Sequence, residues 1–366
     1  MHALDLESVR NDFLKTVTRR APAHLELARR TLTRVSPARW QMEWNLPRWL
    51  GETFGLAQAI AREFVLSNVL GLVAIRLQDD LADGDVAIEE IDSANELARA
   101  LYTAALEIYR PYFPRQAMFW TRVENYMREW RDATTMVNAL NVSDLNELNA
   151  FESKAAQCLV QLGAPRKISA FAVCELTQPE KYPALNQLLD HAFIAAVLHD
   201  HAVDLDKDLR ARRWNLFVAA VSSLPQSRAR EQANRKRVAQ AWLTRASPRE
   251  YFQATLKHVE CAQQLNRSLQ IGGLDVYLDQ LCLEVQRTHD TLSEQFANAF
   301  ARMAEKLFNG QALSPRTTKG GTTSLASPPR SNQHFSRDKE EPWQPNSKNK
   351  RSHPKRSLTS HIESGS

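Results

Sequence analysis

Apolar side chains recur with the period of an α-helix through most of the chain before residue 310. Residues 50–81 form one long apolar stretch without proline, as expected for a helix that is buried on several sides. The helical period is also found in residues 90–109, 117–140, 144–162 and 184–209. Glycine and proline separate these stretches, and no run alternates apolar and polar positions for long enough to predict a strand. The pattern therefore predicts an all-α fold, a single-domain bundle of roughly eight to ten helices.

The last part of the chain has a different composition. Residues 311–366 are rich in Ser, Pro, Thr, Asn, Lys and Arg and have almost no aliphatic side chains after Leu325. Such a segment buries too little apolar surface to offset its ordering entropy. We therefore predict a helical domain over residues 1–310 and a disordered tail over residues 311–366. The tail has ten Lys and Arg against four Asp and Glu, which leaves the domain near neutral and without a nucleic-acid-binding charge.

Other features of the sequence favour a cytoplasmic protein. The N-terminus has no basic and apolar signal pattern, and no apolar run is long enough for an integral membrane segment. None of the four cysteines belongs to a CxxC pair, so we expect free thiols in a reducing compartment.

An acidic cluster ends the apolar stretch of residues 50–81. On a helix, Asp79 and Asp83 lie about 40° apart, and Asp80 lies within about 100° of Asp79. Three carboxylates at a helix C-terminus repel one another and the negative end of the helix dipole, unless cations compensate. Carboxylate oxygens suit Mg²⁺, although an acidic helix end exposed to solvent is the alternative. Arg76, one turn earlier, is expected to neutralise Asp79.

A second acidic group follows the apolar residues 192–198. Asp200, Asp204 and Asp208 recur at every fourth position, which keeps them on one stripe about 80° wide. Such a stripe on a buried helix is unfavourable unless a metal ion, or salt bridges to Lys207 or Arg212, compensates it. The two acidic groups are about 120 residues apart, and two such helices facing each other would form a metal-lined mouth above an apolar cavity.

These motifs resemble those of the class I isoprenoid synthase superfamily, the terpene synthases and trans-prenyltransferases. Asp79-Asp80-Leu81-Ala82-Asp83 is similar to the family's DDxxD motif. Residues 204–215 resemble a D-W-x-x-D-x-x-x-G-R-x-N motif of a bacterial branch, with Leu205 and Arg212 replacing its Trp and Gly. The spacing of Asp200, Asp204 and Asp208 is also that of the terpene synthase NSE motif. The resemblance covers roughly residues 40–300.

The resemblance implies an isoprenoid synthase fold and a Mg²⁺-dependent ionisation of a prenyl diphosphate, followed by cyclisation or elimination with release of diphosphate. It implies three Mg²⁺ ions, two on Asp79, Asp80 and Asp83 and a third on Asp200, Asp204 and Asp208. It also implies diphosphate contacts from Lys154, in a segment similar to one of the prenyl synthases, and from Arg213. The expected partner is a prenyl diphosphate substrate, and a homodimer is left open.

Two alternatives remain open at this point. Chain-elongating trans-prenyltransferases carry an N-terminal Gly-Gly-Lys-Arg element for isopentenyl diphosphate, and this chain lacks it. It has only Arg29, Arg30, Arg34 and Arg39 there, which we interpret as a solvated helix face. An elongating enzyme would need a second basic cluster at the same mouth. A non-catalytic helical scaffold would have its aspartates tied up by Arg76, Lys207 and Arg212, with no cavity beneath.

The residues before Asp79 give a prediction about the cavity. Ala74, Ile75, Gly71 and Leu72, and then Ser67 and Asn68, are expected to line it. The nearest aromatic residue on this helix is Phe64, about 22 Å below Asp79 by helical rise, which favours a substrate of twenty carbons or more. We interpret Phe119, Trp120, Tyr126 and Trp130 as core residues, with a cavity lining as the alternative.

Overall fold

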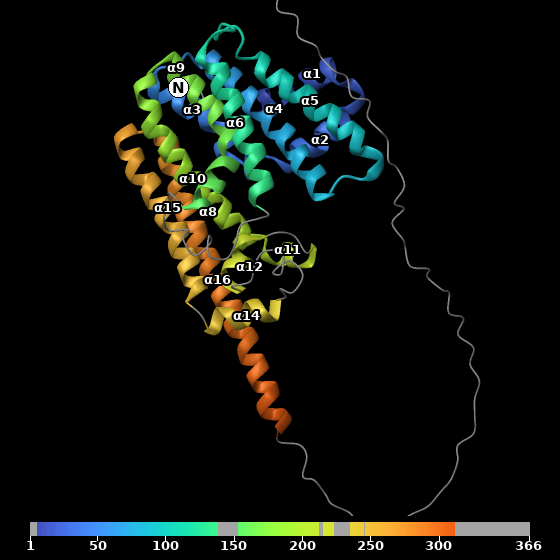
Figure 1. Cartoon of the computed structure of the whole chain (residues 1–366), viewed down its shortest axis with the longest axis vertical. Coiled ribbons are helices and arrows are strands. Elements are labelled where there is room, and N and C mark those ends of the chain that lie inside the picture. The colour runs from blue at the N-terminus through green and yellow to red at the C-terminus, as the bar shows by residue number, and fades with distance from the viewer. Residues whose placement is uncertain (1–5, 138–152, 212–214, 223–234, 245, 312–366) are drawn as a thin grey trace, which may run out of the picture. The chain divides into compact units, whose positions relative to one another are not determined.

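The computed structural model describes residues 6–137, 153–211, 215–222, 235–244 and 246–311. Within these ranges the chain forms fourteen α-helices, four short 3₁₀ helices and no strand, which confirms the predicted all-α fold (Figure 1). The helices outnumber the prediction because several expected helices are broken into two. All the described residues belong to one compact unit, residues 1–312. The predicted tail lies outside the described residues from residue 312 onward, so its disorder stays a prediction.

The α-helices are α1 (Leu6–Arg20), α2 (Leu25–Arg34), α3 (Gln41–Phe54), α4 (Gln58–Asp83), α5 (Ile91–Glu107), α6 (Met118–Met136), α8 (Lys154–Leu162), α9 (Lys167–Leu176), α10 (Tyr182–Val203), α11 (Leu205–Ala211), α12 (Leu216–Ser222), α14 (Arg235–Thr244), α15 (Ser247–Leu269) and α16 (Gly272–Gln311). The 3₁₀ helices are η1 (Pro22–His24), η2 (Ile88–Glu90), η4 (Ala164–Arg166) and η5 (Pro179–Lys181).

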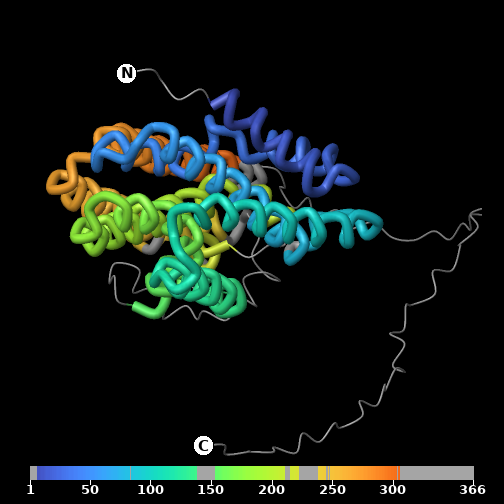
Figure 2. The backbone as a smooth tube through the Cα atoms, turned by 90° about the horizontal axis from the view of Figure 1, so that it is seen from above, coloured from blue at the N-terminus to red at the C-terminus, as the bar shows by residue number. Residues whose placement is uncertain are grey.

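Helix α4 packs against neighbours on several sides, as its apolar sequence predicts. It contacts α1, α2, α3, α5 and α9. One hydrophobic core forms between α1, α2, α4 and α5. A larger core joins α3, Phe64 of α4, α6 and α8–α10 with α12 and α14–α16. Figure 2 shows α1 and α2 along one side of the bundle and α6 along the opposite side. Because both cores use α4, this helix is a rigid support for the residues at its C-terminal end.

The long apolar stretch of residues 50–81 is two helices rather than one. The helix α3 ends at Phe54, and Gly55 follows with a φ of 82°. Its N–H bonds the carbonyl of Gly51, which satisfies an acceptor at the helix end. Glycine adopts this left-handed conformation without the steric penalty of a Cβ, so the chain turns here and α4 begins at Gln58.

Helix α10 carries the second acidic group and is shorter than predicted. It is buried along most of its length and ends at Val203, with Asp204 as its C-cap. A separate short helix, α11, follows from Leu205 to Ala211. The predicted helix of residues 184–209 is therefore interrupted within its acidic stripe. The first part of the predicted helix 144–162 lies outside the described residues, and α8 begins at Lys154.

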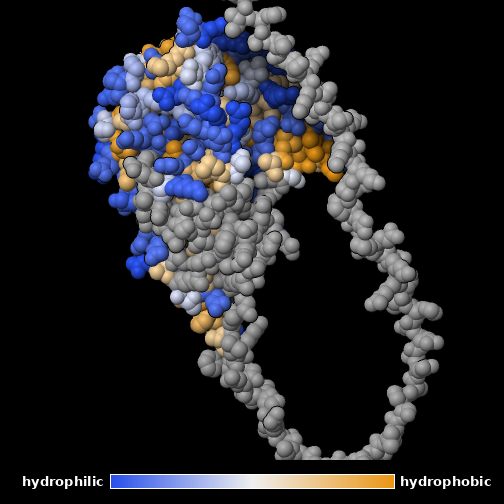
Figure 3. All heavy atoms as spheres, viewed as in Figure 1, coloured by the Kyte–Doolittle hydropathy of each residue, from blue (hydrophilic) through white to orange (hydrophobic). Residues whose placement is uncertain are grey.

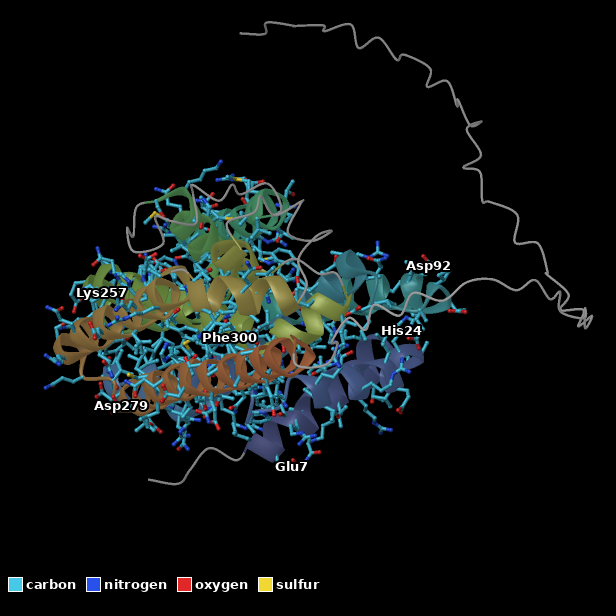
Figure 4. All side chains as sticks on the ribbon, turned by 90° about the horizontal axis from the view of Figure 1, so that it is seen from below. Glu7, His24, Asp92, Lys257, Asp279 and Phe300 are labelled. Carbon is cyan, nitrogen blue, oxygen red and sulfur yellow. The ribbon has the colours of Figure 1, made fainter. Side chains whose placement is uncertain are left out.

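The outer surface of the described part is mostly polar. No described helix is long and apolar enough to cross a membrane, as the sequence predicts. The face in Figure 3 is mainly hydrophilic, with apolar side chains in small groups. Glu7, Asp92, Lys257 and Asp279 are exposed and lie at the periphery of the helices (Figure 4).

Candidate functional site

A cavity of about 220 Å³ lies along one face of α4, below its acidic C-terminal end. This face of α4 contributes Ser67, Asn68, Gly71, Leu72 and Ile75, which recur once per helical turn at positions 67/68, 71/72 and 75. The five residues are those expected from the sequence. A Cβ at Gly71 would meet no atom within 4 Å, so this glycine leaves the cavity wall open.

The expected role of Ala74 is wrong. Its side chain is buried in the core between α1, α2, α4 and α5 and does not line the cavity. Successive residues on a helix are 100° apart, so Ala74 faces the core between α1, α2, α4 and α5 while Ile75 faces the cavity. Because α4 is buried on both sides, a residue can be one turn below Asp79 and still face away from the site.

Aromatic side chains from other elements close the cavity. Trp40, Tyr102, Tyr109 and Trp130 are among its lining residues. Phe64 does not line the cavity and instead packs behind Tyr109, with the ring centroids 4.8 Å apart. The depth expected from Phe64 is therefore not available, because side chains from α5, α6 and their flanking segments occupy part of that space.

Of the four aromatic residues of the α6 segment, Phe119 and Tyr126 are buried core residues, as interpreted from the sequence, and Trp120 is half-buried and packs against the core. Phe119 stacks on Phe113 at 4.1 Å, and Trp120 donates to the carbonyl of Pro114. The hydroxyl of Tyr126 bonds that of Tyr182. Trp130 alone of the four lines the cavity.

Asp79 lies at the rim of this cavity and is half-buried. Helix α4 ends four residues later, where Gly84 takes a φ of 72°. The side chain of Asp83 lies outside the described residues, so its part in a metal site stays a prediction. Among the described side chains of this acidic cluster, Asp79 is the one that lines the cavity.

Asp80 has a different environment from Asp79. Its side chain is only 3% exposed, and Arg34 at the end of α2 holds both oxygens, at 2.6 and 3.0 Å. Arg76 also lies 2.8 Å from Asp80 Oδ1, although it was expected to neutralise Asp79. Both carboxylate oxygens therefore accept hydrogen bonds from guanidinium groups, a strong interaction that joins α2 to α4. This arrangement indicates a role for Asp80 in the packing of α2 against α4.

The three aspartates of the second group do not share one environment. The exposed fractions of the side chains of Asp200 and Asp204 are 61% and 23%, whereas Asp208 is only 7% exposed. Asp208 accepts a hydrogen bond of 2.8 Å from Asn215. The same asparagine donates to the carbonyl of His201 and accepts from the backbone of Val218, so it begins α12. Because the chain bends at Asp204, Asp208 turns into the protein rather than toward the other two.

Asp200 lines a second cavity, of about 200 Å³, together with Arg39, His199, Tyr277 and Glu284. Although the Asp200 side chain is exposed, the cavity walls desolvate it. This desolvation, and secondly the carboxylate of Asp204, raise the pKa of Asp200. Arg39 lies 3.9 Å from Asp200, and Lys207 lies 3.0 Å from Asp204.

The two cavities adjoin each other. Trp40, Glu43, Arg166 and Val197 line both. Arg166 forms the centre of this shared wall: its Nε lies 3.2 Å from Glu43 Oε1, and its guanidinium lies over the rings of Trp40 and Phe193. Asp79 and Asp200 thus line neighbouring cavities that share the side chain of Arg166 in their walls.

The acidic side chains near the two cavities are possible ligands for Mg²⁺. Mg²⁺ in enzymes uses one or two carboxylates together with water and substrate phosphates. The neighbouring carboxylates of Asp200 and Asp204 fit that requirement, since a cation would offset the desolvation and, secondly, the repulsion from Asp204 that raise the pKa of Asp200. Among the described side chains, no three acidic, histidine or cysteine groups lie close enough together to hold a metal ion. The three Mg²⁺ ions implied by the resemblance therefore stay a prediction.

Of the two basic residues expected to contact diphosphate, the structure describes Lys154. Lys154 is exposed at the first turn of α8 and lines neither cavity. Arg213 lies outside the described residues. Arg76 lines the first cavity, Arg39 the second, and Arg166 both. Sequence reasoning missed Arg166, because nothing in its local sequence distinguishes it from a surface arginine.

Comparisons with models of protein families, with curated proteins and with solved structures gave no match.

Proposed function

We propose that this chain is a class I isoprenoid synthase-type enzyme that ionises a prenyl diphosphate with the help of Mg²⁺ and then converts the carbocation by cyclisation or elimination. The observation that carries this proposal is the position of Asp79, an acidic side chain at the rim of a largely apolar cavity lined by the same helix. A substrate with an ionic head and a hydrocarbon chain requires this combination.

The proposed metal-binding residues are Asp79 with Asp83, and Asp200 with Asp204. Mg²⁺ bound there supplies a Lewis acid that stabilises the charge on the leaving diphosphate. We assign Asp80 and Asp208 to positioning instead, because each is buried and accepts hydrogen bonds from protein groups.

Three arginines are the proposed cationic contacts for the diphosphate. Arg76 and Arg166 line the cavity below Asp79, and Arg39 and Arg166 line the cavity of Asp200. Guanidinium groups suit phosphate oxygens because they donate two parallel hydrogen bonds. Lys154 and Arg213 remain predicted contacts on the basis of the resemblance alone.

The hydrocarbon chain is proposed to lie among Leu72, Ile75, Tyr102 and Trp130. Apolar walls exclude bulk water, and the ring faces can stabilise a cation. Ligand pockets commonly measure about 300–1,000 Å³, so a cavity of about 220 Å³ favours a chain of ten or fifteen carbons over the twenty or more expected from the sequence.

The second candidate is a chain-elongating trans-prenyltransferase. The second cavity favours it, because Arg39 and Arg166 provide a basic pair next to the first cavity. Against it, these arginines lie beside Asp200 and Glu43, so the second cavity has no clear excess of positive charge. The scaffold alternative gains from the pairing of Asp80 with Arg34 and Arg76, but it predicts no cavity beneath the acidic helix end.

Product analysis tests the proposal. The purified full chain would be incubated with Mg²⁺ and geranyl, farnesyl or geranylgeranyl diphosphate, each with and without isopentenyl diphosphate. Gas chromatography and mass spectrometry of the extract would then identify the products. New terpenes from the single substrates support the proposal. Longer prenyl diphosphates that form only with isopentenyl diphosphate support the elongating enzyme, and unchanged substrates in every tube refute both.

A further inference from the structure

A further cavity, of about 320 Å³, is lined by residues of α6, α8, α9 and α10, and α6 and α10 each pack against α8 and α9 (Figure 1). It shares no lining residue with the cavities of Asp79 and Asp200. Among its described lining residues Val160 is the one aliphatic side chain, and most of the others are charged groups or amides. Because buried polar groups need polar partners, such a cavity suits a small polar ligand better than a hydrocarbon chain.

A buried ion pair lines this cavity. Lys167 and Asp190 are only 3% and 5% exposed, and their charged groups contact each other. Asn186 donates to the other oxygen of Asp190 at 3.2 Å. An ammonium group can donate three hydrogen bonds, and Asp190 is the partner of Lys167 among the described residues, so donors remain for a ligand. Apolar side chains often hold two helices together as well as a buried ion pair does, so packing alone does not account for this pair.

Two charges of opposite sign on α6 line the same cavity. Arg122 and Glu129 are seven residues apart, which is about two helical turns, and Tyr126 lies between them on the same face. The guanidinium of Arg122 lies over the rings of Tyr126 and Phe171, 5.9 and 5.5 Å from their centroids, rather than against a carboxylate. Glu129 has no ion-pair partner among the described residues. The cavity thus offers one cation and one anion that can each take an opposite charge from a ligand.

The charges of the cavity walls favour a ligand that carries both signs. Lys167 and Asp190 balance each other, and so do Arg122 and Glu129. Desolvation raises the pKa of Asp190, Lys167 lowers it, and the carboxylate of Glu129 raises it again. A positive group next to Glu129 would relieve the repulsion between these two carboxylates. A negative group would accept charge-assisted hydrogen bonds from Arg122 and Lys167. A ligand with a single charge satisfies only one of these two sets.

We propose that this cavity binds a small zwitterion of the amino-acid type, with its carboxylate held by Arg122 and Lys167 and its ammonium group held by Glu129. The amides of Gln157 and Gln161 line the remaining wall and suit a polar side chain. The site is independent of the proposed function, because it shares no residue with the two cavities that would bind a prenyl diphosphate.

Isothermal titration calorimetry of the full chain tests the ligand class. The probes are L-serine, L-glutamine and L-lysine, and for each one an analogue that lacks the α-amino group and one that lacks the α-carboxylate. At least one amino acid should bind with a Kd below about 1 mM, and each of its analogues should bind at least about tenfold more weakly. If none of the three binds, or if an analogue with one charge binds as tightly as its parent, the inference is wrong.

Substitutions on α6 test the location. Arg122→Gln and Glu129→Gln should each weaken binding of that amino acid by about tenfold or more, because each removes one charge that the ligand needs. Binding of the analogue without the amino group should fall in Arg122→Gln but not in Glu129→Gln. Arg128→Gln and Glu124→Gln are the matched controls, since both residues lie exposed on α6 and do not line the cavity, so the affinity should not change.

The target residues are at the surface or half-buried, so the variants should fold, and circular dichroism melting curves check this. Folded Arg122→Gln and Glu129→Gln proteins that bind the amino acid like the wild type would refute the site. Equal losses of affinity in the target and control variants would also refute it, because they would show a general effect of the charge of α6.

Discussion

Replacing Asp80 with asparagine removes the negative charge that Arg34 and Arg76 share, while keeping the shape of the side chain. The wild-type carboxylate accepts two hydrogen bonds from Arg34, at 2.6 and 3.0 Å, and forms an ion pair with Arg76 at 2.8 Å. Each such bond contributes about 1.5–3 kcal/mol in isolation. Arg34 is half exposed and asparagine keeps one acceptor oxygen, so we expect a loss of about 2–4 kcal/mol in the free energy of unfolding.

The matched control is Asp79→Asn, one residue earlier at the cavity rim. It removes a charge from a repelling acidic cluster, so its free energy of unfolding should stay within about 0.5 kcal/mol of the wild type or rise slightly. Urea unfolding followed by circular dichroism measures both variants. Equal stability of Asp80→Asn and the wild type would contradict a structural role for Asp80, and equal losses in the two variants would remove the distinction between them.

Three other predictions concern the cavity, acid stability and the tail. Gly71→Phe should fold and shift the substrate preference toward shorter prenyl diphosphates, because the new side chain fills open space in the cavity; substrate profiles check this. Ala74→Phe should instead lower the free energy of unfolding by about 1–3 kcal/mol, because it overpacks the core between α1, α2, α4 and α5; urea unfolding checks this. Burial lowers the pKa of His191 and His201 from 6.5 to about 4, so both stay neutral in the folded state. Their contribution to the free energy of unfolding is complete above about pH 6.5 and is lost as the pH falls toward 4, by up to about 3 kcal/mol for His201 and by less for His191, whose partial exposure to solvent weakens the effect. Melting curves from pH 7.5 to 4.5 should show this fall, and constant melting temperatures would contradict it. Deleting residues 311–366 should leave the melting temperature and activity nearly unchanged, and a large drop in either would show that the tail packs on the domain.

The sequence predicts most of the helices and one face of the cavity because both depend on local periodicity. The apolar pattern identifies α4, and its spacing correctly selects Gly71 and Ile75 as lining residues. It wrongly selects Ala74. Periodicity shows which residues share a helix face, but α4 is buried on opposite faces, and the sequence does not show where the face that lines the cavity ends. Its shape also depends on Tyr109 and Trp130, which come from other elements.

The partners of the aspartates were not predictable in the same way. Arg34 is 46 residues from Asp80 in the chain, and only the packing of α2 against α4 brings them together. The bend at Asp204 is similarly set by tertiary structure, because Asp208 bonds Asn215 and turns away from the stripe that an unbroken helix would have formed. The spacing of acidic residues therefore identifies candidates for metal binding, and the fold decides which of them face the cavity.

The most direct test of the proposed function is the rate of Mg²⁺-dependent diphosphate release from geranyl or farnesyl diphosphate. The wild type should release diphosphate with Mg²⁺ and stop when the metal is chelated. Asp79→Asn and Asp204→Asn should each lower the rate by at least about a hundredfold while remaining folded, because a metal ligand acts mainly in the transition state. Release that does not depend on Mg²⁺, release that survives both substitutions, or no release from either substrate would contradict the proposed function.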